Sequence, residues 1–257
     1  LPKVAWVMDG YWDDYADWAK PLLSKLKGVL CPLASYATPL TELGVKNLVI
    51  SPFPFMPKDR PDVCRSKTPL LIWPNQWKNI KGVNGFVDCI PGLPPNVRVE
   101  LYSNGIRYYQ MRTEPRWLAA VKTDHFQGHN GTGRAVFFGN VDLPEIAKAY
   151  QRAWFTVNLQ GSATKRKTYT KGSYNNTEVE ALWYGACPVL HSSTLGTDMP
   201  KDIYIAVESA DEIPDAIRKS LKSGFALDPV RQKKAREFVK RKHLAADRYQ
   251  ELRGLLV

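Results

Sequence analysis

The residues of this chain whose types and spacing best fit a binding site lie in segment 176–190. The segment reads Asn-Thr-Glu-Val-Glu-Ala-Leu-Trp-Tyr-Gly-Ala-Cys-Pro-Val-Leu. This pattern predicts a helix that follows a polar loop, has Glu180 one turn in, ends at Gly185 and leads into a short apolar strand. The first turn of a helix has unpaired N–H groups and the positive end of the helix dipole, so it can bind a phosphate. Glu180 would then accept hydrogen bonds from a sugar diol beside the phosphate. The alternative is a capped helix packed under a parallel sheet, which is common in α/β domains.

A second candidate is the loop 73–82, which contains Gln76, Lys78 and Lys81 and ends at Gly82. It follows a predicted strand and precedes a predicted helix, and such loops lie at the carboxyl edge of a sheet, where α/β proteins bind ligands. Lysine there supplies a mobile point charge for a diphosphate. The alternative is an exposed lysine pair with no specific role.

A third candidate is the basic loop 162–175, between a predicted strand and the helix of the first segment. It contains Lys165, Arg166 and Lys167. Loops in this position shape the ligand crevice of doubly wound sheets. Its charges fit an acceptor contact or plain solvation equally well.

The elements that must position these residues alternate along the whole chain. Short β-branched runs followed by helical patterns predict βαβ units and a mostly parallel sheet. We expect strands at 4–8, 28–32, 47–50, 70–73, 97–102, 135–138, 155–159, 187–191 and 203–207. We expect helices at 14–26, 36–43, 143–153, 211–222 and 229–256.

The segment 51–61 contains four prolines, which disfavour regular structure, and is the best domain boundary. We therefore predict an N-terminal α/β domain at 1–60 and a Rossmann-like domain at 61–228. The C-terminal helix at 229–257 is predicted to cross back to the first domain. The first domain is short, so we expect either that it is partial, with the chain starting abruptly at Leu1, or that acceptor binding is minimal.

Composition and charge limit the function classes. The chain has 257 residues, 44% of them hydrophobic, which is typical of a globular protein rather than a disordered or fibrous one. Its net charge of +11 favours a polyanionic partner: nucleic acid, an anionic membrane surface or phosphorylated small substrates. No apolar run approaches the length of a membrane span, and the four cysteines form no CxxC pair. We expect an intracellular, cytoplasmic protein with free thiols and no metal site.

Taken together, these motifs resemble the donor half of GT-B glycosyltransferases, in particular the retaining family-4-like group. The resemblance rests on a basic loop ending in Lys81-Gly82, a glycine at a strand end (Gly139), the run 153–159, and segment 180–189, which is similar to the family's helix pattern Glu-Ala-hydrophobic-x-x-Gly-x-Pro-Val. Residues 31–52 are similar to the end of the family's first domain. Order and spacing agree over roughly residues 4 to 222.

The resemblance implies a GT-B-like fold and a role for each matching residue. Glu180 would bind the nucleotide ribose, while Lys81 and Lys78 would bind the diphosphate. The donor site would also include Gln76, Gly139, Asn176, Thr177 and Glu178, with backbone amides near Thr177 and Glu178 completing the phosphate cradle.

Two positions depart from the family pattern. Gln76 occupies the place of an arginine, for which Lys78 could substitute, and Gly172 occupies the place of an acidic residue that contacts the donor sugar. Asp9 matches a position beside the sugar and is a candidate to orient the acceptor hydroxyl, or else it caps the following turn.

The reaction implied is transfer of a sugar, with retention, from a nucleotide-diphosphate donor, most simply a UDP-sugar, with no cofactor or metal. Charge and the basic loop favour duplex DNA carrying a hydroxymethylated base as the acceptor, as in phage DNA-modifying glycosyltransferases. A cell-envelope or lipid-linked glycan is the alternative acceptor. A non-catalytic module that binds sugar nucleotide or DNA is a further alternative, since the acidic residue at 172 is missing.

Overall fold

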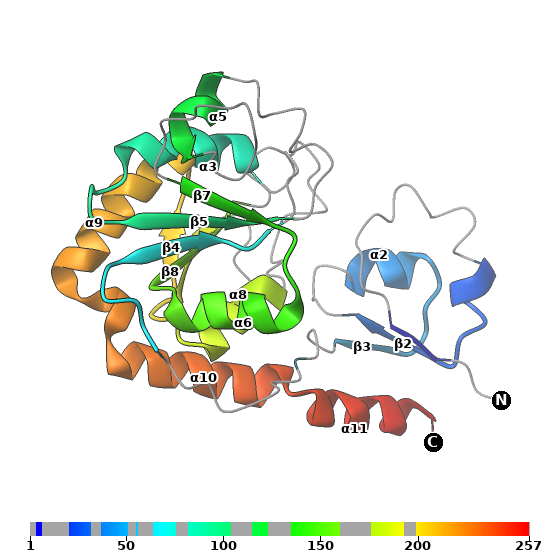
Figure 1. Ribbon diagram of the computed structural model, residues 1–257. Coiled ribbons are helices and arrows are strands. Elements are labelled where there is room, and N and C mark those ends of the chain that lie inside the picture. The colour runs from blue at the N-terminus through cyan, green and yellow to red at the C-terminus, as the bar shows by residue number, and fades with distance from the viewer. Residues whose placement is uncertain are drawn as a thin grey trace.

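Two parallel β-sheets organise the described part of the chain, one in each of two parts (Figure 1). The computed structural model describes residues 4–6, 21–31, 37–50, 55, 64–75, 82–103, 115–122, 135–159, 176–192 and 199–256. Parallel pairing throughout confirms the predicted α/β class.

The first sheet has three strands in the order β1-β2-β3: Val4–Trp6, Gly28–Cys31 and Leu48–Ile50. Helix α2 (Ala37–Glu42) connects β2 to β3. The predicted strands and the predicted helix at 36–43 are confirmed, whereas most of the predicted helix at 14–26 lies outside the described residues. A small apolar core formed by residues such as Val29, Leu40 and Val45 holds this part together.

The second sheet has seven strands in the order β10-β9-β8-β4-β5-β7-β6. The strands are β4 (Leu70–Trp73), β5 (Arg98–Tyr102), β6 (Val121–Lys122), β7 (Ala135–Gly139), β8 (Phe155–Asn158), β9 (Cys187–His191) and β10 (Ile205–Val207). Six of them match predicted strands. The edge strand β6 was not predicted, because two residues are too few to show a hydrophobic period.

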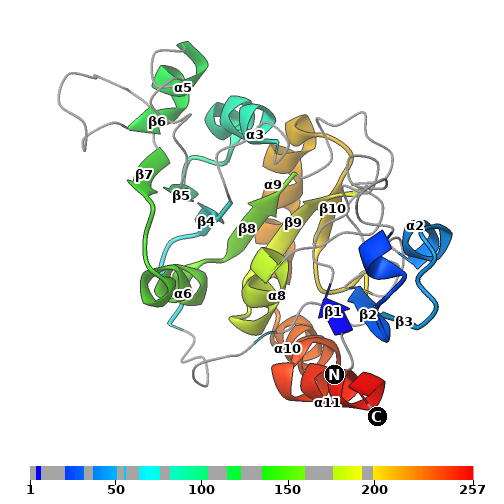
Figure 2. The ribbon, with the colours of Figure 1, turned by 90° about the vertical axis from the view of Figure 1, so that its right-hand side faces the viewer.

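Helices cover both faces of this sheet (Figure 2). One apolar core joins the sheet to α3 (Val83–Cys89), α5 (Pro115–Ala120) and α9 (Ile213–Ser223). A second core joins the opposite face to α6 (Leu143–Arg152), α8 (Asn176–Trp183) and α10 (Pro229–His243). Short 3-10 turns at Ile90–Gly92, Ala210–Glu212 and Phe225–Leu227 complete the described elements. The strand order reverses between β4 and β8, and ligands of open α/β sheets bind at the carboxyl ends of strands beside such a reversal.

The C-terminal segment is two helices, not the single helix predicted for 229–256. Helix α10 ends at His243 and α11 (Ala245–Leu256) follows, with Leu244 in an extended conformation at ψ 130°. Phe55 causes this break: its N–H donates to His243 O at 2.6 Å, and its carbonyl accepts from Ala245 N–H at 3.1 Å. Helix α11 then contacts β1 and β2 of the first sheet (Figure 1). No described helix has the length and apolarity of a membrane span.

The turn between α8 and β9 is held by two arginine side chains. Gly185 has φ +80°, which favours glycine, and it ends the helix as predicted. Arg65 donates to Tyr184 O, and also to three carbonyls at the C-terminal end of α6, those of Tyr150, Gln151 and Ala153. Arg231 donates to Gly185 O at 2.6 Å and to Ala186 O at 3.4 Å. The two guanidinium groups therefore satisfy carbonyls that the helix ends leave without intrahelical donors.

Replacing Gly185 with alanine tests this turn. A Cβ there would lie 2.7 Å from Arg65 Nη2, which cannot move without losing its carbonyl partners, and the positive φ adds about 1 kcal/mol of strain. Gly224→Ala is the matched control, because Gly224 has φ +73° and a Cβ added there would meet nothing within 4 Å. In urea denaturation we expect Gly185→Ala to lose at least twice as much unfolding free energy as Gly224→Ala. Equal losses would show that Arg65 does not restrain the turn.

Candidate active site at the carboxyl edge of the large sheet

The carboxyl ends of four strands are tied into a rim by hydrogen bonds. The Asn75 side-chain amide, just after β4, donates to Val157 O of β8 at 3.0 Å. The Ser103 N–H, just after β5, donates to Gly139 O of β7 at 2.9 Å. Because Asn75 is 5% exposed, its bond to Val157 is shielded from water. The rim therefore presents loops whose starting points are rigid.

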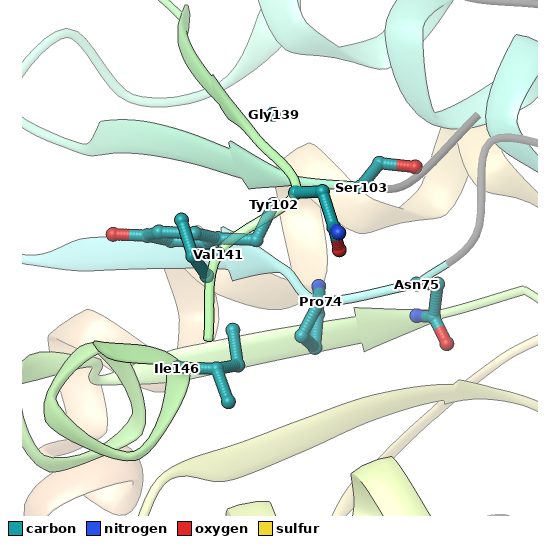
Figure 3. Close-up of a pocket in the computed structure, with 8 residues that line it drawn as sticks. Pro74, Asn75, Tyr102, Ser103, Gly139, Val141 and Ile146 are labelled. Atoms are coloured by element: carbon teal, nitrogen blue, oxygen red, sulfur yellow. The ribbon is translucent and has the colours of Figure 1, made fainter. Parts of the chain in front are cut away.

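A pocket of about 200 Å³ opens in this rim (Figure 3). Its walls come from the ends of β4, β5 and β7 and the start of α6: Pro74, Asn75, Tyr102, Ser103, Gly139, Asn140, Val141 and Ile146. Figure 3 shows Tyr102, Val141 and Ile146 on one side of the hollow and Asn75 on the other. Gly139, with φ +71°, turns the chain from β7 towards α6. The pocket therefore combines apolar walls with a few polar groups, as small-molecule sites do.

Tyr102 is fixed in this wall by a buried charge network. Its hydroxyl donates to Glu100 Oε2 at 2.6 Å, and Arg152 Nη2 lies 3.0 Å from the same oxygen. Burial, with the Glu100 carboxylate next in effect, raises the pKa of Tyr102 well above its ordinary range. The ring stacks on Phe138 with centroids 5.0 Å apart. Tyr102 is thus a neutral, immobile side of the pocket.

Helix α8 brings two carboxylates to the rim, and they differ in environment. Glu178, in the first turn, is 2% exposed; its Oε1 accepts from Asn158 Nδ2 at 2.6 Å and from Thr177 Oγ1 at 3.0 Å. Asn158 is the last residue of β8, so this bond fixes the start of α8 against the strand end. Glu178 is therefore used to position the helix.

Glu180 lies in the second turn of α8 and is half-buried. Removal from water, with a smaller contribution from the nearby Glu178 charge, raises the pKa of its carboxyl to about 7, and the Tyr150 hydroxyl opposes that rise. The Tyr150 hydroxyl acts on it from α6, and that hydroxyl is buried and has no other hydrogen-bond partner in the described part of the chain. A carboxylate that is partly removed from water and has oxygen lone pairs left over is well suited to accept hydrogen bonds from a ligand.

The structure describes some of the predicted site residues and not others. Gly139 lines the pocket, Asn176 and Thr177 lie in the first turn of α8, and Glu178 and Glu180 lie as given above. The remaining predicted residues, and the departure at Gly172, lie outside the described residues: Asp9, Gln76, Lys78, Lys81, Lys165, Arg166 and Lys167. Over the parts of the chain that are described, no group of three or more His, Cys, Asp or Glu side chains could hold a metal ion.

Sequence reasoning missed four residues of this region: Asn75, Tyr102, Tyr150 and Asn158. A signal existed for the two asparagines, since each follows or ends an apolar strand, where a polar side chain reaches the carboxyl edge of a parallel sheet. No sequence signal pointed to the two tyrosines, because their roles depend on which elements pack against them.

Comparison with known proteins gives likeness in structure alone. No protein-family model matches the chain, and no curated protein matches it in sequence. Anabaena HepE in complex with UDP-glucose is similar over 99% of this chain and 72% of its own, with a TM-score of 0.72 and 12% identity. A mutant of S. aureus TarM, in complex with fondaparinux, alpha-GlcNAc-glycerol and UDP, is similar over 94% of this chain, with a TM-score of 0.70 and 12% identity. The pneumococcal O-GlcNAc transferase GtfA, in complex with UDP and GlcNAc, is similar over 95% of this chain, with a TM-score of 0.58 and 12% identity.

These matches establish the fold. The chain has a GT-B-like α/β fold, with a Rossmann-type parallel sheet and a smaller N-terminal α/β part, as predicted. It spans about half of the TarM and GtfA chains, 46% and 48% respectively.

Replacing Glu180 with glutamine tests how its carboxylate is buried. A carboxyl whose pKa rises from 4.5 to about 7 on folding costs no stability below pH 4.5, and its full cost appears above pH 7. We therefore expect Glu180→Gln to stabilise the ligand-free protein at pH 8 by up to about 3 kcal/mol, and to have little effect at pH 5. Denaturant unfolding at both pH values measures this. The control is Glu237→Gln, an exposed position on α10, which should change stability little at either pH.

Proposed function

We propose that this protein binds a nucleotide-diphosphate sugar, most simply a UDP-sugar, at the carboxyl edge of its seven-stranded sheet. One observation supports this most: Glu180 is a half-buried carboxylate whose pKa burial raises to about 7, and it lies one turn into a helix that starts at the rim. Two adjacent hydroxyls of a ribose are suitable donors for such a group. The diphosphate would then lie towards the first turn of α8, whose amides and dipole favour an anion.

We propose that the base of the nucleotide lies in the pocket beside Tyr102. Its apolar side, formed by Tyr102, Val141 and Ile146, suits the flat face of a base, while Asn75 and the backbone around Gly139 supply polar groups. The HepE structure contains UDP-glucose and the TarM structure contains UDP, which supports the same ligand class here. From the sequence, we still predict that Lys78 and Lys81 bind the diphosphate as well.

We propose that the bound donor transfers its sugar to an acceptor hydroxyl with retention, without a metal ion. In this reaction the bond from the anomeric carbon to the diphosphate oxygen breaks, a bond from that carbon to the acceptor oxygen forms, and the proton of the acceptor hydroxyl passes to the leaving diphosphate. The first turn of α8 and the two lysines would stabilise the negative charge that develops on the leaving diphosphate. Asp9 stays the candidate that orients the acceptor.

Donor binding and turnover test this function. Titration calorimetry should detect UDP binding, and Glu180→Ala should weaken it about tenfold to hundredfold, because hydrogen bonds to a charged group are lost. Glu237→Ala should leave it unchanged. Release of free sugar from a panel of UDP- and GDP-sugars distinguishes an enzyme from a binding module. Binding without any turnover in a full-length chain would support the non-catalytic alternative.

For the acceptor we propose duplex DNA that carries a hydroxymethylated base. The net charge of +11 supports it, and so do two cations near the end of α10, Lys240 and Arg241, which are exposed. The glycoside alpha-GlcNAc-glycerol in the TarM structure supports the alternative of a cell-envelope glycan.

Salt dependence and acceptor choice separate these acceptors. We expect duplex DNA to retain the protein at about 50 mM salt and to release it by about 500 mM. Binding displaces counterions from the DNA phosphates, and this displacement becomes less favourable as the salt concentration rises. Radiolabelled sugar should appear on hydroxymethylated DNA but not on unmodified DNA. Labelling of a glycan or lipid-linked acceptor with no labelling of DNA would favour the envelope enzyme.

A further inference from the structure

The hydroxyl group of Tyr150 is a buried polar group without a hydrogen-bond partner in the part of the chain that the structure describes. Tyr150 lies on α6, is 1% exposed, and packs where α6 contacts α8. A buried donor left unpaired lowers stability, so native structures retain few of them. A tyrosine retained here rather than a phenylalanine therefore calls for a reason beyond packing.

The groups that face this hydroxyl are the two carboxylates of α8. Glu180 and Glu178 both act on Tyr150 electrostatically, as does Tyr184, whose ring is parallel to that of Tyr150 with centroids 6.0 Å apart. Glu178 already accepts hydrogen bonds from Asn158 and Thr177. Glu180 is thus the carboxylate that the Tyr150 hydroxyl can serve.

We propose that Tyr150 is a positioning residue, whose hydroxyl donates to Glu180 and holds that carboxylate ionised and turned towards the ribose of the donor. The role towards the ribose rests on the function proposed above, whereas the pairing itself does not. Helix α6 also contributes Ile146 to the pocket, one turn before Tyr150. One helix would therefore supply both a wall of the nucleotide pocket and the group that orients its carboxylate.

The pairing has a consequence for pH dependence. The titratable side chains that act on the Glu180 carboxyl are Tyr150 from α6 and Glu178 from α8, and they act in opposite directions. The Tyr150 hydroxyl favours the ionised form, whereas the Glu178 charge disfavours it. Loss of the Tyr150 hydroxyl should therefore raise the pKa of Glu180. As the pH is lowered, the variant should then lose donor binding at a higher pH than the parent protein does.

The first experiment uses ligand-free protein, so it does not depend on the proposed function. Carbon-13 NMR of carboxyl-labelled glutamate should show one group titrating near neutral pH, and Glu180→Gln should remove that signal. We expect Tyr150→Phe to raise its midpoint by roughly half a pH unit or more. Tyr184→Phe is the matched control: it removes the hydroxyl of the stacked partner ring and should leave the midpoint unchanged. An unchanged midpoint in Tyr150→Phe would overturn the pairing.

Should Tyr150→Phe fail to fold, 3-fluorotyrosine incorporation keeps the test open. The fluorinated phenol is a stronger donor, so the Glu180 midpoint should fall, and a midpoint that stays constant would contradict the proposal.

The second experiment measures UDP affinity from pH 6 to pH 9. We expect Tyr150→Phe to bind UDP several-fold more weakly than the parent near pH 7, and the difference to be smaller at pH 9, where Glu180 is ionised in both and only its orientation is lost. A purely structural loss would weaken binding equally at every pH and would overturn the positioning role. Absence of UDP binding with the NMR shift intact would count against the donor function alone.

Discussion

Two guanidinium groups, that of the buried Arg231 and that of the partly buried Arg65, hold the turn that ends α8, and the geometry of the site depends on them. Arg65 and Arg231 donate to backbone carbonyls on either side of Gly185. Burial first, and their mutual proximity next, lower the pKa of Arg65 to about 10, so this arrangement has an electrostatic cost. The carbonyls they satisfy are the negative ends of helix dipoles, which offsets that cost. Arg65 also reaches the end of α6, so one side chain sets the two helices side by side.

That arrangement determines what the opposite ends of the helices can do. With α6 and α8 fixed at their C-terminal ends, the start of α8 meets β8, and the start of α6 borders the pocket beside Tyr102. Glu180 is brought between the helices, into surroundings that raise the pKa of its carboxyl to about 7. Burial of this carboxylate lowers stability at a pH where it is ionised. Such local cost is typical of residues kept for binding rather than for folding.

The two sheets are connected by backbone as well as by side chains. Phe55, in the proline-rich segment, pairs with Leu244 where α10 gives way to α11, and its ring contacts Trp183 at the end of α8 with centroids 5.8 Å apart. The chain thus passes between the two parts of the protein at two points, Phe55 before the seven-stranded sheet and Leu244 after it, and these two points are paired. The same junction lies against the helix that carries Glu180, so the site and the connection between the parts share α8.

Much of this architecture was determined by the sequence alone, because hydrophobic alternation and turn residues are local properties. They predicted the parallel strands, the helix near Asn176 and its end at Gly185. Tertiary structure decided that the Glu178 carboxylate positions the helix and that the Glu180 carboxylate is left for a ligand. Glu178 and Glu180 are two residues apart, about 200° around a helix, so they face different neighbours. The sequence does not state which side meets Asn158 of β8 and which meets Tyr150 of α6, since those partners are 20 and 30 residues away and only packing brings them together. For the same reason the sequence did not show the break at Leu244, because Phe55, which pairs with Leu244, is far from it in the sequence.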